Sequence, residues 1–223
     1  MSGTFVSKEL TYRISTLLPS CLDIRVAYGT TETGKPGAGI EIKIINTKTG
    51  YINRSGQPAR GHSRMIGYWR DDVKTREVID ECGWYRTGDL VVMDSQGYMK
   101  IIGRIKDIIV RAGENIYPQE VEDVLDKNPA ILKAYVCGVP DDRMGEEVCA
   151  WIKLNDNPGD KLNDQEVKQY CKQRMAKYKV PRYIMFVGQF PCTPAGKVKK
   201  YSMSEQSCLM LGLTDVNNNL EVL

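Results

Sequence analysis

Strands and helices alternate along the second half of the sequence, and this alternation constrains the fold more than any other feature. Short apolar runs predict strands, and segments with helical spacing separate them. Pro118 stands where the first position of a helix is expected, and Asn163 followed three residues later by Glu166 is a capping-box pattern. The sequence therefore predicts an α+β domain with strands at 107–111, 131–139, 148–154 and 183–187 and a last helix at 201–211.

The first half of the sequence is richer in predicted strands. The segment 40–45 (IEIKII) alternates apolar and polar residues, which indicates a half-buried antiparallel strand. Acidic residues at the start of 71–81 suit a helix N-terminus. A β-rich part thus extends to about Arg104, with further short β-segments predicted at 23–28, 84–86, 90–93 and 98–102.

The composition excludes several classes of function. The 31 basic and 28 acidic residues are spread along the chain without a block of one sign, which argues against a nucleic-acid partner. Seven cysteines without a C-x-x-C pair, and a single histidine, predict reduced thiols in an intracellular compartment and no zinc site. No apolar run reaches the roughly 18 residues of a membrane span, and residues 1–20 lack the pattern of a signal peptide.

Two polar motifs suit a nucleotide. In WYRTGDL, Asp89 follows a Thr-Gly turn, and one carboxylate can accept hydrogen bonds from two neighbouring ribose hydroxyls. An aspartate that caps its own turn fits the motif equally well. In AYGTTETGKPG, threonine hydroxyls can hold phosphate oxygens and Glu32 can hold Mg²⁺, and a threonine-rich turn explains the motif equally well.

Two further motifs lie in the second half. In GRIKDIIVRAGENIYPQEVE, Arg104 and Lys106 precede a predicted strand, and Gly113 either permits close approach of a ligand or serves an ordinary turn. In TPAGKVKK, Lys197 follows a Pro-Ala-Gly turn and can reach into a cleft as a point charge against a phosphate. When the motif is taken alone, a solvated surface lysine is the preferred interpretation of Lys197.

The order of these motifs resembles the C-terminal part of the AMP-forming acyl-CoA synthetases of the adenylate-forming superfamily. The motifs occur in the same order as in that family: YGTTET, GYW, YRTGDL, GRIKD and PAGKVKK. Their residues are most similar to those of the medium-chain fatty-acid branch. The resemblance implies an α/β (α+β) fold in which a hinge joins two parts. These are a remnant of the large AMP-binding domain with its β-rich subdomain (1–104) and a small C-terminal α+β domain (105–212), followed by a tail (213–223).

The resemblance also implies a reaction and its residues. A carboxylic acid reacts with Mg·ATP to give an acyl-adenylate, and the thiol of CoA then displaces AMP. Lys197 is expected to be the adenylation lysine, Glu32 to hold Mg²⁺ and Lys106 to be the hinge. The nucleotide-binding residues are expected to be Tyr28, Thr31, Asp89, Arg104 and Lys197, and the pantetheine channel is expected to include Gly113 and Glu114.

The sequence departs from the family pattern in two places. It has no Ser/Thr/Gly-rich phosphate loop, and Thr33 runs directly into the GKPG that opens the next strand. We therefore expect the 223-residue chain to have little ligase activity alone. The rival interpretation is a non-catalytic module that binds CoA, a nucleotide or a partner protein, and a third is a partial gene product with no independent role. The resemblance predicts a mitochondrial location, and a cytoplasmic one is expected only if the chain, in which no targeting segment is seen, is complete.

Overall fold

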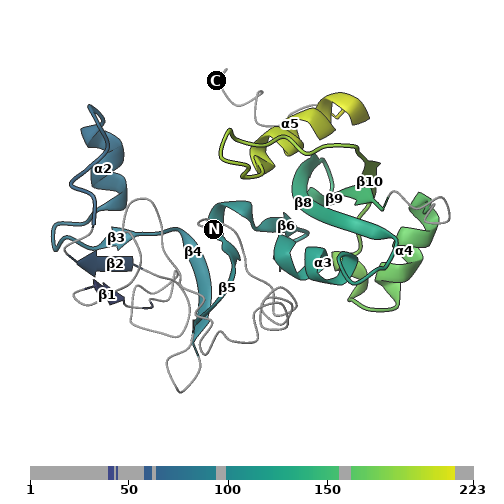
Figure 1. Cartoon of the computed structure of the whole chain (residues 1–223), viewed down its shortest axis with the longest axis horizontal. Coiled ribbons are helices and arrows are strands. Elements are labelled where there is room, and N and C mark those ends of the chain that lie inside the picture. Colours follow the sequence, from purple (N-terminus) through teal and green to yellow (C-terminus); the bar gives the residue numbers. More distant parts are fainter. Residues whose placement is uncertain are drawn as a thin grey trace, which may run out of the picture. The chain divides into compact units, whose positions relative to one another are not determined.

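The computed structural model describes residues 40–42, 44, 58–61, 64–93, 99–155 and 162–213. The chain divides into two compact units, Met1–Met99 and Lys100–Leu223 (Figure 1). The predicted strand at 23–28 and the threonine-rich loop that follows it lie outside the described residues. The mixture of helices and strands confirms the predicted fold class.

The first unit contains a three-stranded antiparallel sheet in the order β1-β2-β3. Strand β1 (Ile40–Ile42) pairs with β2 (Pro58–Gly61), and β2 pairs with β3 (Tyr85–Arg86). The strand predicted at 40–45 is thus confirmed over its first three residues. Strands β4 (Asp89–Met93) and β5 (Met99–Arg104) form a separate two-stranded sheet.

Helix α2 (Asp72–Val78) begins as predicted but ends early. The side chain of Asp71 accepts a hydrogen bond from the backbone N–H of Lys74 at 2.9 Å, which caps the first turn. The sequence predicted a helix to residue 81, but Ile79 is extended and bridges Tyr85 in an antiparallel pair. A β-branched residue favours this extended backbone, so the helix ends where Ile79 can pair with a strand partner.

The second unit is built on one five-stranded sheet. Strand β9 (Gly145–Leu154) is antiparallel to β8 (Ile131–Asp141) along nearly its whole length. It also pairs with β6 (Ile109–Arg111) at Gly145 and, in parallel, with β10 (Tyr183–Phe186) over Cys149–Ile152. Strand β7 (Glu114–Ile116) extends the sheet beyond β6 as an antiparallel partner.

Two strand predictions in this unit were inaccurate. Residues 140–147 were expected to form a loop, but β8 continues to Asp141 and β9 begins at Gly145. The carboxylate of Asp141 accepts the backbone N–H groups of Arg143 and Met144 at 3.1 and 3.0 Å, so three residues suffice to reverse the chain. The strand predicted from Asp107 begins two residues later, because Ile105–Asp107 forms a short 3₁₀ turn.

The helices of this unit begin where the sequence signals predict. Pro118 is the first residue of α3 (Pro118–Leu125), and Asn163 and Glu166 form the reciprocal capping box of α4 (Asp164–Lys172). A second 3₁₀ turn covers Lys177–Lys179. Helix α5 (Lys200–Leu211) ends at Gly212, whose positive φ of 64° suits a left-handed C-cap.

The two faces of the five-stranded sheet are covered by different helices (Figure 1). On one face, Val121 and Leu125 of α3 and Val167 and Cys171 of α4 pack against Val136 and other residues of the sheet. On the other face, Met203 of α5 packs against a cluster that includes Cys137, Val139, Cys149 and Trp151. Fully burying each such aliphatic side chain contributes roughly 1.5–3 kcal/mol, so this unit has a core of its own.

Candidate functional site

Lys197 lies at the end of a tight hairpin that we call the lysine hairpin, Pro191–Lys199. Cys192 and Val198 form an antiparallel bridge, and the backbone N–H of Thr193 donates to the carbonyl of Lys197 at 2.7 Å. The hydroxyl of Thr193 accepts the backbone N–H of Lys197 at 3.1 Å, and Gly196 turns the chain with a φ of 79°. The hairpin therefore maintains its shape largely through its own hydrogen bonds.

The side chain of Lys197 is exposed, and its amine has no ion pair or hydrogen bond to any residue that the structure describes. By contrast, Lys200, three residues further on, lies against a buried carboxylate. An exposed lysine amine on a glycine-containing turn is a cation available to an external anion, and a phosphate oxygen is the chemistry it suits best.

Glu122 anchors the base of the lysine hairpin, and no pattern in the sequence indicates this role. Its side chain is 2% exposed, and its Oε1 accepts the N–H of Val136 at 2.9 Å and the amine of Lys200 at 2.6 Å. Since Lys200 is the first residue of α5, this pair connects α3, β8 and the start of α5. A buried carboxylate is tolerated there because both its charge and its lone pairs are used.

Gly113 and Glu114 lie at the turn between β6 and β7. Arg111 pairs with Glu114, so Ala112 and Gly113 are the two residues of the loop, and both have positive φ, 50° and 82°. Positive φ at both central residues is the signature of a type I′ hairpin turn. A Cβ placed on Gly113 would meet no atom within 4 Å, so the backbone conformation alone requires glycine here. This backbone is open to a ligand.

Arg104 and Lys106 lie near the start of the second unit. Arg104 is the last residue of β5 and precedes the 3₁₀ turn, in which Lys106 is the exposed central residue. The N–H of Ile108 closes that turn on the carbonyl of Ile105 at 3.3 Å. The hinge role of Lys106 stays a prediction.

Asp89 belongs to the first unit. It is the first residue of β4 and is 5% exposed, and its backbone N–H donates to the hydroxyl of Thr87 at 3.1 Å. Gly88 before it has a φ of 71°. The Thr-Gly-Asp turn predicted from the sequence is thus present, and its ribose-binding role stays a prediction. Tyr28, Thr31 and Glu32 lie outside the described residues, so their roles also stay predictions.

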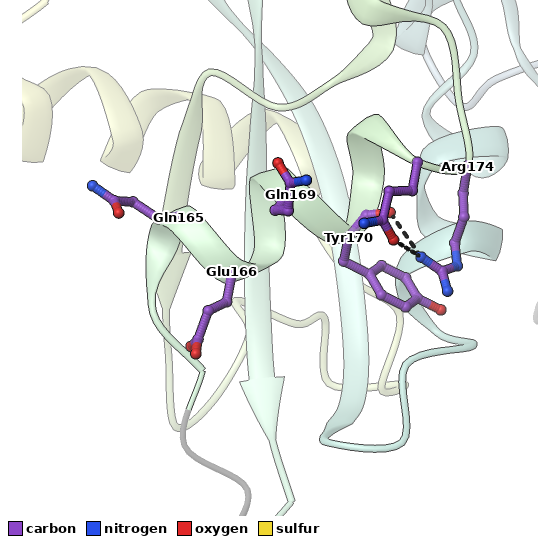
Figure 2. A pocket seen from close by; sticks show the side chains of 6 residues that line it. Gln165, Glu166, Gln169, Tyr170 and Arg174 are labelled. Carbon is purple, nitrogen blue, oxygen red and sulfur yellow. Dashed lines mark hydrogen bonds between the residues drawn. The ribbon is translucent and has the colours of Figure 1, made fainter.

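A surface depression on α4 has a different lining from any of these motifs (Figure 2). The guanidinium of Arg174 lies 3.9 Å from the ring centre of Tyr170 and donates to the carbonyl of Tyr170 at 3.2 Å. The depression is lined by Gln165, Glu166, Gln169, Tyr170, Gln173 and Arg174. Because a single helix and the residues just after it form the whole lining, the depression lacks convergent groups that would orient a ligand.

Two searches of the described residues for other kinds of site gave no candidate. No helix among them combines the length and the apolar character needed to cross a bilayer. No group of three or more histidine, cysteine, aspartate or glutamate side chains in the described part of the chain is arranged to hold a metal ion.

Comparison with known proteins supports the resemblance. Residues 120–197, from α3 to Lys197, match the AMP-binding enzyme C-terminal domain. The mitochondrial medium-chain acyl-CoA ligase ACSF2 of Bos taurus is 42% identical over 208 residues, which cover 82% of this chain and 34% of the relative. The putative acyl-CoA synthetase YngI of Bacillus subtilis is 40% identical over 216 residues, which cover 86% of this chain and 39% of the relative. The chain therefore spans about a third of the length of the curated relatives it matches.

Solved structures show the same architecture. MatB from Rhodopseudomonas palustris, bound to ATP, matches 81% of this chain and 40% of its own with a TM-score of 0.74 and 29% identity. The o-succinylbenzoate CoA synthetase MenE from Bacillus subtilis, in complex with an acyl-adenylate, also matches. The match covers 79% of this chain and 40% of MenE, with a TM-score of 0.69 and 30% identity. The fold and the sequence matches together place the chain in the adenylate-forming class of proteins. Within that class, the chain belongs to the acyl-CoA synthetase family.

Proposed function

We propose that this chain is the C-terminal part of an AMP-forming acyl-CoA ligase that activates a medium-chain fatty acid. In the first half-reaction, a carboxylate oxygen attacks the α-phosphorus of ATP and pyrophosphate leaves. In the second, the CoA sulfur attacks the acyl carbonyl and AMP leaves. The substrates and partners are ATP, CoA and a carboxylic acid, and the location is mitochondrial by similarity to the ACSF2 relatives.

The observation that carries this proposal is the free amine of Lys197 on the lysine hairpin. Negative charge builds up on the α-phosphate and the attacking carboxylate during adenylation, and a fixed cation stabilises that charge. The lysine hairpin holds its shape before any ligand arrives, which reduces the reorganisation needed at the moment of reaction. Lys197 is therefore proposed as the catalytic residue.

The remaining residues take supporting roles in the proposal. Asp89 accepts the ribose hydroxyls, with Arg104 and Tyr28 beside the nucleotide. Thr31 contacts phosphate and Glu32 binds Mg²⁺, which neutralises phosphate charge when bound. Lys106 acts as the hinge between domain 1–104 and domain 105–212, and the backbone at Gly113 and Glu114 contacts the pantetheine arm of CoA.

Pyrophosphate release tests the catalytic competence of the 223 residues by themselves. We expect little acid-dependent release from the purified chain, because the sequence contains no phosphate loop. Calorimetric titration with ATP then tests binding, with Lys197→Ala and Asp89→Ala expected to weaken it and Lys133→Met as a charge-matched control. Robust turnover by the chain would contradict the expected inactivity, and ATP affinity unchanged in both site variants would contradict the assignment of Lys197 and Asp89.

A non-catalytic binding module is the second candidate. The second unit has a buried hydrophobic cluster on each face of its sheet, which favours independent folding of this part. Tight CoA or nucleotide binding to the chain, combined with no turnover after the chain is joined to the other two thirds of a relative's length, would favour the module over the ligase.

A further inference from the structure

Glu147 is a buried carboxylate held by two arginines. Its side chain is 1% exposed, and Arg111 contacts it through two bonds, Nε to Oε2 at 2.7 Å and Nη2 to Oε1 at 3.0 Å. The Nη1 of Arg182 lies 3.3 Å from the same Oε1 and donates to Asp141 at 2.8 Å. Two parallel hydrogen bonds between a guanidinium and a carboxylate fix the orientation of the arginine as well as its distance from the carboxylate.

Arg111 is the residue that leads directly into the type I′ turn. Its remaining donor, Nη1, bonds the carbonyl of Tyr178 at 3.1 Å, so the guanidinium is held by two segments distant in sequence. On the other side of Arg111, the backbone N–H of Ala112 donates to the carbonyl of Met144 at 2.7 Å. The turn is therefore held in place by the side chain of Arg111 and by the backbone N–H of Ala112.

The conformation of Ala112 makes these ties necessary. A φ of 50° is unfavourable for alanine by roughly 1–2 kcal/mol, since its Cβ approaches the carbonyl oxygen. A strained backbone of this kind persists only where surrounding contacts determine it. Glu147 supplies a charge-paired contact of this kind through Arg111, and neighbouring Glu146 adds another by accepting the N–H of Val110 at 2.6 Å.

We propose that Glu147 is a positioning residue for CoA binding, because through Arg111 it holds the Ala112–Gly113 turn in the one shape that presents its backbone to the pantetheine arm. This inference rests on the proposed function. Glu147 is buried behind Arg111 and does not contact the CoA, so its effect is transmitted through the turn.

Amide hydrogen exchange of the 223-residue chain, followed by NMR, tests the positioning step without any ligand. Glu147→Gln keeps the shape of the side chain and removes its charge, and Arg111→Lys keeps the charge and removes the fork. We expect both variants to accelerate exchange of the Ala112 amide on the order of tenfold relative to amides of the β8–β9 ladder. Lys133→Met, which removes the ion pair with Asp126 elsewhere in the same unit, is the matched control and is expected to leave Ala112 unchanged.

Unchanged Ala112 exchange in either variant would overturn the proposal. Equal acceleration at Ala112 and in the β8–β9 ladder would also overturn it, because that result reports a general loss of stability. Calorimetric titration with CoA is the second part of the test. Glu147→Gln is expected to lower the affinity for CoA about tenfold and to leave the affinity for ATP unchanged. If the wild-type chain binds no CoA, the proposed function of this turn fails while the exchange result still decides the positioning step. CoA affinity equal in both proteins would overturn the link to CoA.

Discussion

The lysine hairpin and the β6–β7 turn are both tight reversals with a glycine at positive φ, yet they are stabilised in different ways. The hairpin makes its shape from its own hydrogen bonds and is anchored at its base through Lys200 and Glu122. The turn contains a strained alanine and depends on Glu147, Arg111 and Met144 from outside it. A hairpin held by its own hydrogen bonds can move as a unit with its lysine. The turn is expected to keep its shape only while its contacts with the rest of the unit are made.

The anchor of the lysine hairpin gives the largest expected effect on stability. Glu122→Ala leaves the Lys200 amine and the Val136 N–H without their acceptor, and we expect the free energy of unfolding to fall by about 3 kcal/mol. Glu120→Ala, in the same helix, removes an ion pair at the surface and is expected to cost less than about 1 kcal/mol. Urea denaturation of both variants measures the difference, and equal losses would show that Glu122 is no special anchor.

Raised pH is expected to weaken the core between the sheet and helices α3 and α4. Burial raises the pKa of the Cys171 thiol from 9.0 to about 11. The folded state therefore retains a proton that the unfolded state loses, so this contribution is complete below pH 9 and disappears as the pH rises to about 11. A shift of this size corresponds to roughly 2–3 kcal/mol.

Stability measured from pH 8 to 11 checks this contribution, with Cys171→Ala as the control that lacks the thiol. The wild type is expected to lose more stability over this window than the variant. The Ala112 and Thr193 amides should then accelerate together, because both loops rest on the same unit. Parallel stability curves for the two proteins would refute the pKa assignment.

Alanine at the two turn glycines compares the loops directly. Gly113→Ala and Gly196→Ala each place a Cβ at positive φ in open space, so we expect a loss of about 1 kcal/mol from backbone strain at both positions. Gly188→Ala is the control, since Gly188 lies in equally open space without positive φ, and little change is expected. Thermal unfolding measures all three. A loss at Gly196 several times that at Gly113 would mean that the hairpin tip is packed.

Relief of strain at Ala112 is the smallest expected effect. Asparagine tolerates the left-handed region better than alanine, so Ala112→Asn is expected to raise stability by about 0.5 kcal/mol. Ala112→Val, whose branched side chain disfavours the left-handed region, serves as the control and is expected to lower stability. A gain of equal size in both variants would argue against strain at Ala112.

Local signals in the sequence predicted much of the fold. Pro118 and the Asn163 capping box were correct because a helix start depends on neighbours within one turn. The helix predicted to residue 81 was too long because Ile79 finds a strand partner in Tyr85, which the local pattern does not include. Propensity is overridden wherever such tertiary pairing is available.

The candidate site was only partly predictable for the same reason. The PAGK motif identified Lys197, and the YRTGD motif identified Asp89, because each is a short contiguous stretch. Glu122 was not identified, because its partner Lys200 is 78 residues away in sequence. Glu147 likewise meets Arg111 across 36 residues. Charged residues that are far apart in the sequence become buried anchors once the sheet brings them together.

The most direct test of the role of Lys197 joins these 223 residues to the preceding two thirds of the bovine relative and measures acid-dependent pyrophosphate release. Lys197→Ala is expected to slow release by a factor of roughly 100–1,000, as for loss of a fixed charge that stabilises the transition state. Transfer of a supplied acyl-adenylate to CoA should continue, because Lys197 is assigned to adenylation alone. Release at the unsubstituted rate in Lys197→Ala would contradict the assignment of Lys197 as the adenylation lysine.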